Sequence, residues 1–262
     1  MEIKKLMLTK LEIEKLKYFL QKKQYQEFHP KTMGKIKEIG WCKLEKYNLS
    51  KTFDSKRAEY IFNNLNFKSL KVLDIGADIG YFSFSAALSG ASEVISIEGE
   101  EESSEFIKLQ LKLLGMEGIV KVQDVQFDFD VEQNEKYDVI LCLNVLHHVG
   151  RYFGDSNLTL EEAKEKLIEY LNLISYSTKY CWLQVGYNWK GDVKLPLFAN
   201  GSKRELIEFV ISNISNYWEV EKIAILNDKT MNYSSDDHRM DRINELGEFG
   251  NRPLFLLKSK FQ

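Results

Sequence analysis

Two histidines and an asparagine follow an apolar run in the segment "LCLNVLHHVG", residues 141–150. Asn144, His147 and His148 are spaced i, i+3 and i+4, so a helix that begins there would bring all three near one face. An imidazole can remove a proton from a hydroxyl near neutral pH. The segment therefore predicts a general base at His147 or His148.

Two other interpretations of this segment stay open. Asn144, His147 and His148 could bind a divalent metal ion that activates a hydroxyl, although hard cations prefer oxygen ligands. Alternatively, His148 caps or packs a helix and has no catalytic role. The donor types favour a histidine base over a metal site.

A glycine-containing turn with two acids, "VLDIGADIGYF", follows another apolar run at residues 72–82. Gly76 permits a ligand to approach the backbone closely, and Gly80 lets the next helix pack against the strand. Asp74 and Asp78 would repel a pyrophosphate, but they would attract an amine or a sulfonium. The turn also lacks the Gly-Lys-Ser/Thr sequence of a P-loop. These residues predict a zwitterionic ligand and disfavour ATP.

Carboxylates recur at the ends of the next two apolar runs. Glu98, in "VISIEGE", is placed to accept hydrogen bonds from both hydroxyls of a ribose. Asp124, in "IVKVQDV", can accept a hydrogen bond from the amino group of an adenine, and Asp128 in "QFDFD" is the second choice for that role. Together with the acidic turn, these positions predict a cofactor of the adenosine type.

The succession of "VLDIGADIGYF", "ISIEGE", "VQDV" and "YDVILCLNVLHHV" resembles the class I S-adenosylmethionine-dependent methyltransferases over roughly residues 71–149. The resemblance implies S-adenosylmethionine as the cofactor. The cofactor-binding residues that it implies are Asp74, Gly76, Ala77, Asp78, Gly80, Tyr81, Glu98, Gly99, Asp124, Val125 and Asn144.

Two narrower resemblances concern the methyl acceptor. "GADIGYFSF", with Trp41 upstream, is similar to a subgroup that contains tRNA-uridine carboxymethyl-transferring enzymes and sugar or polysaccharide methyltransferases. Some ubiquinone-pathway O-methyltransferases of this fold carry acidic and histidine residues at a spacing like that after residue 143. They are the basis of the metal alternative, from which Asn144 and His147 depart because acids are expected there.

The elements that must position these residues alternate between short apolar runs and helical patterns, which predicts a mostly parallel sheet covered on both faces. The expected strands are "LKVLDIG", "SEVISIE", "IVKVQDV", "YDVILCL" and "KYCWLQVGYN", and the expected helices span roughly residues 80–88, 102–114, 160–173 and 203–214. "YWEVEKIAIL" and "RPLFLLKSK" predict a terminal antiparallel pair. We expect a Rossmann-like α/β fold with seven strands over residues 66–262.

Residues 1–65 are expected to form a basic helical extension. Residues 1–71 hold 17 Lys and Arg against 8 Asp and Glu, or +9, which leaves −12 for the rest of a chain with a net charge of −3. Apolar spacing predicts a helix within residues 3–28 that Pro30 and Gly34 end, and a second helix from Thr52 to Leu65 with Thr52 or Asp54 as its cap. The basic segment either forms a solvated face or meets an anionic substrate.

Two later segments are candidates for contact with the acceptor. "QVGYNWKGD" places Tyr187, Asn188 and Trp189 after the fifth expected strand, with stacking and hydrogen-bonding groups suited to a sugar or a base. "SSDDHRMDR" brings His238 and Arg239 into the polar stretch 228–251. That stretch is expected to be a substrate lid or an ordinary polar loop.

These patterns predict an S-adenosylmethionine-dependent enzyme that methylates a hydroxyl of a small anionic substrate, such as a sugar phosphate, a nucleotide sugar or a polysaccharide precursor. The alternatives are a tRNA-base methyl- or carboxymethyltransferase and a metal-assisted O-methyltransferase. The three cysteines, Cys42, Cys142 and Cys181, lie far apart, which favours a reducing cytoplasm. No apolar run is long enough to span a bilayer, so no membrane partner is expected.

Overall fold

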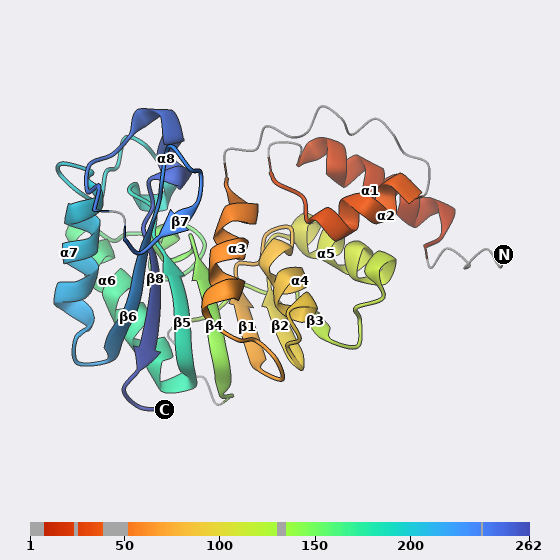
Figure 1. The fold of residues 1–262 in the computed structure, drawn as a ribbon, viewed down its shortest axis with the longest axis horizontal. Coiled ribbons are helices and arrows are strands. Elements are labelled where there is room, and N and C mark those ends of the chain that lie inside the picture. Colours follow the sequence, from red (N-terminus) through yellow and green to blue (C-terminus); the bar gives the residue numbers. More distant parts are fainter. Residues whose placement is uncertain (1–7, 24–25, 39–51, 130–134, 237) are drawn as a thin grey trace.

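The centre of the computed structural model, which describes residues 8–23, 26–38, 52–129, 135–236 and 238–262, is an eight-stranded sheet (Figure 1). The strand order is β3-β2-β1-β4-β5-β8-β6-β7. The strands are β1 (Lys71–Ile75), β2 (Glu93–Ile97), β3 (Val120–Gln123), β4 (Tyr137–Leu143), β5 (Thr178–Gln184), β6 (Trp218–Leu226), β7 (Tyr233–Ser234) and β8 (Leu254–Ser259). The strands from β3 to β5 are parallel, and β8 runs antiparallel to both β5 and β6.

The Rossmann-like α/β fold and the terminal antiparallel pair are thereby confirmed. The eighth strand is the two-residue β7, which pairs with β6 at Ile225 and Leu226. The four helices expected from the sequence are α4 (Tyr81–Leu88), α5 (Glu101–Leu114), α6 (Leu160–Leu173) and α7 (Lys203–Ile214).

Helices cover both faces of the sheet because its strands are apolar on both sides. On one face, Leu73 of β1 lies in a buried cluster with Leu167 of α6 and Val210 of α7. On the other face, the neighbouring Val72 lies in a cluster with residues of α3 (Asp54–Asn64), α4 and α5, among them Phe84. Successive side chains of β1 thus enter opposite cores, as expected for a buried parallel strand.

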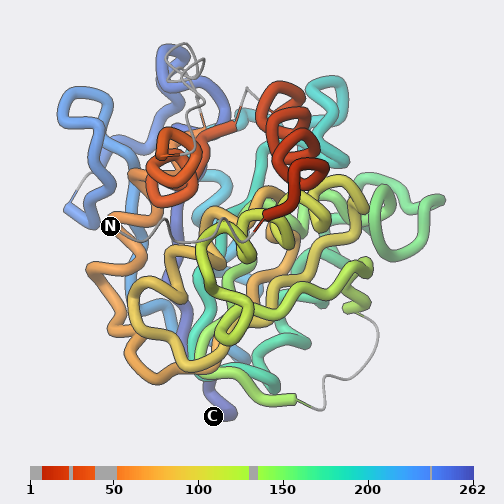
Figure 2. The backbone as a smooth tube through the Cα atoms, turned by 90° about the vertical axis from the view of Figure 1, so that its right-hand side faces the viewer, coloured from red at the N-terminus to blue at the C-terminus, as the bar shows by residue number. Residues whose placement is uncertain are grey.

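Two N-terminal helices, α1 (Lys10–Lys22) and α2 (Pro30–Glu38), lie against α5 (Figure 1). Figure 2 shows them in red beside the yellow-green α5. They form a third buried cluster, in which Leu16, Phe19 and Leu20 of α1 meet Ile79 and Phe106. The extension is therefore packed onto the rest of the molecule through its own apolar core.

The helix expected within residues 3–28 is shorter in the structure, and Pro30 and Gly34, which were expected to end it, belong to the next helix. α1 ends at Lys22, and Pro30 begins α2. Proline is tolerated at a first helical position because its missing N–H has no partner there in any case. Gly34 lies inside α2 on an exposed position, where a glycine costs about 1 kcal/mol and does not end the helix.

The expected cap of α3 also differs. Phe53 occupies the N-cap position with φ 57°, and its side chain makes no capping hydrogen bond. Thr52 Oγ1 donates instead to Asp54 Oδ2 at 2.6 Å. Trp41 and Cys42 lie outside the described residues.

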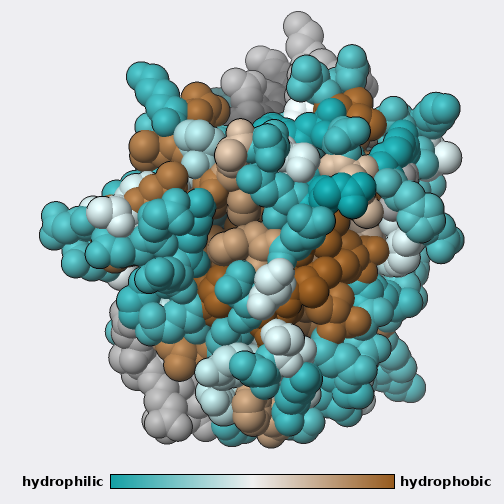
Figure 3. Space-filling model, turned by 90° about the vertical axis from the view of Figure 1, so that its left-hand side faces the viewer, coloured by the Kyte–Doolittle hydropathy of each residue, from teal (hydrophilic) through white to brown (hydrophobic). Residues whose placement is uncertain are grey.

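The side of the molecule formed by β6, α6 and α7 faces the viewer in Figure 3, where apolar side chains gather near the middle and hydrophilic ones surround them. None of the helices in the described part of the chain combines the length and the apolar character that crossing a membrane requires.

Candidate active site

A cavity of about 650 Å³ lies at the carboxyl edge of the parallel strands. Its walls come from the segments that follow β1, β2, β3 and β4, from the start of α3, from the end of α1 and from the segment before β8. Open α/β sheets bind ligands at this edge, where the strand order reverses, which here is between β1 and β4. Small-molecule sites typically measure about 300–1,000 Å³, so both the place and the size fit a cofactor together with a substrate.

The charged residues of the lining divide into two groups. The acidic half consists of Asp74, Asp78, Glu98 and Glu100, with Lys23 as its one cation among the lining residues of the described chain. The basic half consists of Arg57, Arg151 and Arg252, with the acids Asp54 and Glu248. The two halves therefore present opposite formal charge to whatever enters the cavity.

The turn after β1 takes the backbone conformation that its glycine predicts. Gly76 has φ +66°, and a Cβ there would lie 2.9 Å from Val145 Cγ2, so a side chain is strained as well as crowded. Asp78 also has a positive φ, of 51°. Asp74 is buried and accepts a hydrogen bond from Ser83 Oγ at 2.6 Å, and its burial raises its pKa to about 7.

Glu98 is fixed by two backbone donors. The Asp78 N–H donates to one carboxylate oxygen at 2.7 Å, and the Glu100 N–H donates to the other at 2.8 Å. Burial raises the pKa of Glu98, while these two hydrogen bonds oppose the rise. Each oxygen keeps a further lone pair, so the carboxylate can accept from two vicinal hydroxyls in the cavity.

Several positions predicted for the cofactor line the acidic half, and others do not. Besides the acids, Gly76, Ala77, Tyr81, Gly99 and Val125 border the cavity. Gly80 lies behind it, where a Cβ would meet Phe84 Cζ at 2.9 Å. This contact agrees with the packing role that the sequence predicts for Gly80.

The two candidate adenine acceptors lie outside the lining. Asp124 forms an ion pair with Lys108 at 3.4 Å, and Asp128 is exposed. The neighbouring Val125 and Gln126 border the cavity. The side chain of Gln126 fills the space that a Cβ on Gly99 would occupy, at 2.2 Å from Gln126 Nε2. The role of Asp124 toward adenine stays a prediction.

A continuous polar chain crosses the basic half. Arg57 Nη1 donates to Gln184 Oε1 at 2.6 Å, and Asn144 Nδ2 donates to the same oxygen at 3.1 Å. Arg252 Nη1 donates to Asn144 Oδ1 at 2.8 Å. The chain ends in ion pairs at both sides, from Arg57 to Asp54 and from Arg252 to Glu248, the latter at 2.8 Å.

The two arginines of this polar network, Arg57 and Arg252, are buried, each with 4% of its surface exposed. Burial also lowers the pKa of Arg252. The Nε atoms of Arg57 and Arg252 have no hydrogen-bond partner within the described residues. Burying a guanidinium is costly unless a counter-charge accompanies it, and Asp54 and Glu248 supply that charge here.

His147 is buried, and one of its ring nitrogens is already occupied. The Gly186 N–H donates to His147 Nδ1 at 3.2 Å, so Nδ1 holds a lone pair and the proton of the neutral ring is on Nε2. Burial, together with Arg252 and His148, lowers the pKa of His147 well below its usual value. His147 is thus arranged to donate a hydrogen bond from Nε2.

His148 is the more accessible of the two histidines. Its ring centroid lies 4.2 Å from that of His147, its Nδ1 is buried, and a hydrogen bond with the Lys190 backbone opposes the fall of its pKa. Burial, reinforced by Arg151 and Arg252, lowers the pKa of His148 to about 4. The ring is therefore neutral near pH 7 and can accept a proton.

The helix expected to begin at Asn144 is absent from this described segment. Asn144 has φ 65°, and the only helical residues that follow directly are the 3₁₀ turn Leu146–His148. The i, i+3, i+4 argument for a shared helix face was therefore wrong. The positive φ turns Asn144 toward Arg252 and Gln184, and the 3₁₀ turn places the two histidines side by side.

The aromatic segment after β5 also differs from expectation. Tyr187, Asn188 and Trp189 are buried and do not belong to the lining, although Gly191 does. The Tyr187 hydroxyl donates to the Asn251 carbonyl, and Trp189 Nε1 donates to the Val149 carbonyl, each at 2.7 Å. Satisfied polar groups on buried rings indicate that these residues shape the loop, and their contact with the acceptor stays a prediction.

In the stretch 228–251, the residues that line the cavity are not the predicted His238 and Arg239. Arg239 is paired with Asp228, and His238 is exposed outside the lining. Glu248 and Phe249 do border the cavity. The described part of this stretch thus contributes its last residues to the site, next to Arg252.

The metal alternative finds little support in the contacts. Both ends of the Asn144 amide and Nδ1 of His147 are used by other groups, as described above. Among the described residues, no group of three or more His, Cys, Asp or Glu is arranged to hold a metal ion.

Comparison with known families agrees with the site. A family model described as a methyltransferase domain matches residues 66–234. The ubiquinone biosynthesis O-methyltransferase of Rickettsia akari is 28% identical over 123 residues, which are 44% of this chain and 47% of that protein. The enzyme of the same name from Xanthomonas euvesicatoria is 32% identical over 93 residues, or 36% of this chain and 38% of that protein. The chain spans about half the length, or less, of these curated relatives.

Solved structures share the fold at low sequence identity. A Listeria monocytogenes protein assigned as an S-adenosylmethionine-dependent methyltransferase aligns with a TM-score of 0.51 at 13% identity, over 80% of this chain and 98% of that one. The magnesium protoporphyrin IX methyltransferase of Synechocystis PCC 6803, solved with bound S-adenosylmethionine, aligns with a TM-score of 0.52 at 12% identity, over 92% and 90% of the two chains.

Proposed function

The chain belongs to the class I S-adenosylmethionine-dependent methyltransferases, and from this premise we propose that it methylates a hydroxyl group of a small acidic acceptor. A sugar phosphate, a nucleotide sugar or an acidic polysaccharide precursor has this chemistry. The relatives named as O-methyltransferases support transfer to oxygen.

The acidic half of the cavity suits S-adenosylmethionine, which supplies the methyl group on a positively charged sulfur. Glu98 has lone pairs for the ribose hydroxyls, and Asp74 and Asp78 offer negative charge to an amine or a sulfonium. Gly76 keeps the backbone free of a side chain at the turn. Asp74, Asp78 and Glu98 are the residues we propose to hold the cofactor.

The single observation that carries the choice of an acidic acceptor is the buried pair Arg57 and Arg252 in the basic half. Both line the cavity, both are buried, and Asn144 and Gln184 link them. A planar guanidinium is well suited to a carboxylate or a phosphate. With Arg151, the basic half holds three guanidinium groups against two carboxylates, and a neutral acceptor would leave this excess of positive charge unbalanced.

His148 is the better supported general base. A base must reach the substrate, and His148 borders the cavity and is partly exposed, whereas His147 is buried and its Nδ1 accepts from the Gly186 N–H. His147 can instead donate from Nε2 to an acceptor oxygen and so orient it. Because the pKa of His148 is about 4, the ring holds its lone pair at neutral pH.

The tRNA alternative rests on the narrower resemblance of "GADIGYFSF" and on the basic N-terminal segment, and the charge of that segment gives it less support. Lys15 and Lys22 of α1 pair with Glu105 and Glu102 of α5. Part of the positive charge is therefore balanced within the molecule, so the charge of this segment alone does not indicate a nucleic-acid surface.

The proposal is tested by a methyl-transfer screen with labelled S-adenosylmethionine. The panel pairs each acidic acceptor with its uncharged counterpart: a sugar phosphate with the free sugar, a uronic acid with its methyl ester, and a nucleotide sugar with the sugar. Bulk tRNA is included over a range of salt concentrations, with and without a chelator. We expect product with acidic small molecules, a preference over the uncharged partner, and no effect of chelator.

Two results would contradict the proposal. Equal rates on charged and uncharged partners would remove the acidic acceptor. Methyl transfer to tRNA with binding that falls steeply with salt, and no product from the small molecules, would favour the nucleic-acid alternative, because phosphate contacts release counterions.

A further inference from the structure

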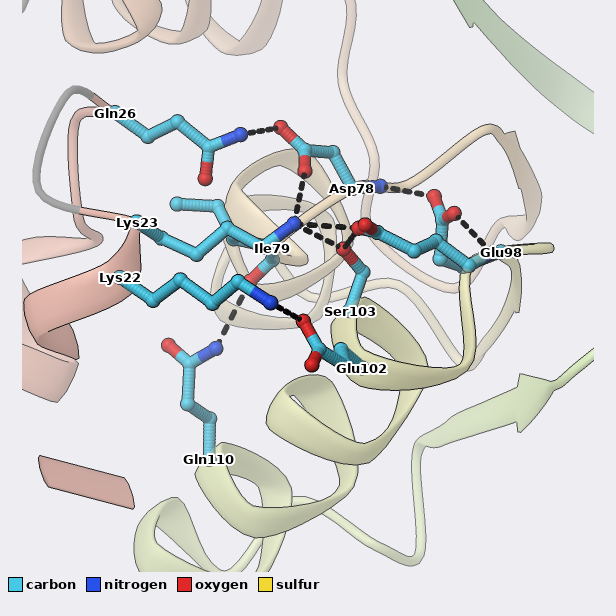
Figure 4. Close-up of polar contacts among 10 residues, drawn as sticks. Lys22, Lys23, Gln26, Asp78, Ile79, Glu98, Glu102, Ser103 and Gln110 are labelled. Carbon is cyan, nitrogen blue, oxygen red and sulfur yellow. Dashed lines mark hydrogen bonds and ion pairs between the residues drawn. The ribbon is translucent and has the colours of Figure 1, made fainter. Parts of the chain in front are cut away.

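The end of α1 lies against the acidic half of the cavity, although α1 is far from it in sequence. Figure 4 shows Lys22, Lys23 and Gln26 reaching from the N-terminal segment toward the loop that carries Asp78 and toward the start of α5. Two of these side chains, Lys23 and Gln26, are almost fully buried and line the cavity.

Lys23 joins three parts of the acidic half. Its ammonium donates to Glu100 Oε2 at 2.5 Å and to Ser103 Oγ at 2.6 Å, and it lies 3.8 Å from Asp78 Oδ1. The hydrogen bond from Lys23, supported by Ser103, lowers the pKa of Glu100. Glu100 is thereby kept ionised beside the other carboxylates.

Gln26 contacts the loop after β1 that contains Asp78 and Ile79, and Thr32 of α2 contacts it through Gln110. Gln26 Nε2 donates to Asp78 Oδ2. From α2, Thr32 Oγ1 donates to Gln110 Oε1 at 2.9 Å, and Gln110 Nε2 donates to the Ile79 carbonyl at 2.9 Å. The N-terminal segment therefore contacts Asp78 directly through Gln26 and reaches the Ile79 carbonyl through Gln110 of α5.

These contacts lead directly to Glu98. The two N–H groups that orient its carboxylate belong to Asp78 and Glu100, which are the residues whose side chains Lys23 contacts. When the side chains of Asp78 and Glu100 are held, their backbone N–H groups are held as well. The position of Glu98 thus depends on a residue of the N-terminal segment.

We propose that Lys23, assisted by Gln26, is a positioning residue for S-adenosylmethionine, and that docking of α1 onto α5 and binding of the cofactor strengthen each other. Lys23 acts through Asp78 and Glu100 and is not itself in the set that accepts the ribose hydroxyls. The inference concerns the cofactor and holds whatever the acceptor is.

The direction in which the Kd of S-adenosylmethionine changes when the charge of Lys23 is removed distinguishes a positioning role from long-range electrostatic repulsion. S-adenosylmethionine carries a net positive charge, so removing a nearby cation should tighten its binding if long-range attraction alone mattered. Positioning predicts the opposite, because Asp78 and Glu100 would no longer be held. S-adenosylhomocysteine shares the ribose and the amino-acid part, so it should weaken by a similar factor.

The test compares Lys23→Met with Lys22→Met by titration calorimetry of the full chain with both ligands. Lys22 is the matched control because it sits beside Lys23 and pairs with Glu102 of α5, which does not line the cavity. We expect Lys23→Met to raise the Kd of both ligands about tenfold, the effect of losing one charge-assisted contact. Lys22→Met should change Kd less than about twofold, and Lys23→Arg should recover most of the loss.

A second measurement needs no variant. By reciprocity, S-adenosylmethionine should slow amide hydrogen exchange in α1 of the wild-type protein. The proposal is overturned if the cofactor leaves exchange in α1 unchanged, if Lys23→Met binds as the wild type or more tightly, or if the two lysine variants weaken binding equally.

Discussion

The two halves of the cavity differ in charge and in how the chain builds them. The acidic half sets four carboxylates against one ammonium, whereas the basic half sets three guanidinium groups against two carboxylates. The acids of the acidic half lie at or just after the ends of two neighbouring strands, β1 and β2. The basic half joins residues 127 positions apart, Arg57 and Gln184, and 108 positions apart, Asn144 and Arg252.

From this difference we infer that the two halves of the cavity bind different ligands. A local turn with fixed acids suits a ligand that the whole family shares, since such a site needs only two neighbouring strand ends. Side chains gathered from distant segments suit a ligand that varies between members, because loops change more readily than the sheet. Substitutions in the two halves should therefore have separable effects, those of the acidic half on cofactor binding and those of the basic half on the acceptor.

The largest effect is expected at His148. We expect His148→Asn to lower kcat about 10²–10⁴-fold, the usual contribution of a positioned base, and to leave the Kd of S-adenosylmethionine unchanged. Steady-state rates with an acceptor found in the screen, together with calorimetry, measure both. His29→Asn is the control, since His29 is also buried with a pKa of about 4 but does not line the cavity.

The pH profile gives the same residue an independent test. Because the pKa of His148 is lowered to about 4, the base form is already present above about pH 5. With S-adenosylmethionine kept saturating at every pH, the rising limb of kcat/KM for the acceptor should therefore lie near pH 4 and should disappear in His148→Asn. A rising limb near pH 6.5 in the wild type under these conditions would contradict this assignment.

Glu98→Gln should produce the next largest effect, on the other half. The amide keeps the shape but loses the charge and one acceptor, so the Kd of S-adenosylmethionine should rise about 10–100-fold. Glu102→Gln, on the same side of the molecule but outside the cavity, should change it little. If Glu98→Gln altered the KM of the acceptor and not the Kd of the cofactor, the assignment of the acidic half would be wrong.

Asp74 should make cofactor binding depend on pH. Its pKa is raised to about 7, so the carboxyl gains its charge only as the pH rises through that value, and a cationic ligand then binds more tightly. We expect the Kd of S-adenosylmethionine to fall with rising pH, by up to about tenfold per unit below about pH 7. Calorimetry of the wild type and Asp74→Asn should show this slope in the wild type alone.

The sequence alone allowed much of the acidic half to be predicted and little of the basic half. Asp74, Asp78 and Glu98 stand in short ordered motifs at strand ends, where their positions follow from the topology. Arg57 sits in a helix without a distinguishing pattern, and Arg252 stands before β8, far along the chain. A polar Gln184 at the end of a buried strand was a signal of a shared network that the sequence analysis did not use.

The differences between the expected and the observed positions of these side chains have the same physical origin. The helix expected after β4 depended on side-chain spacing, but Asn144 takes a left-handed backbone conformation that spacing does not show. Tyr187 and Trp189 look like acceptor contacts by residue type, yet their polar atoms find partners within the fold. In both cases long-range hydrogen bonds decide where the side chain lies.

We propose that the basic half recognises the acceptor and the acidic half recognises the cofactor. The kinetics of Arg252→Lys, which keeps the charge but loses the planar donor set, test this directly when an acidic acceptor is compared with its uncharged counterpart. We predict that KM for the acidic acceptor rises about tenfold, while KM for the uncharged one and the Kd of S-adenosylmethionine stay as in the wild type. An equal change for both acceptors, or a loss of cofactor affinity instead, would contradict the claim.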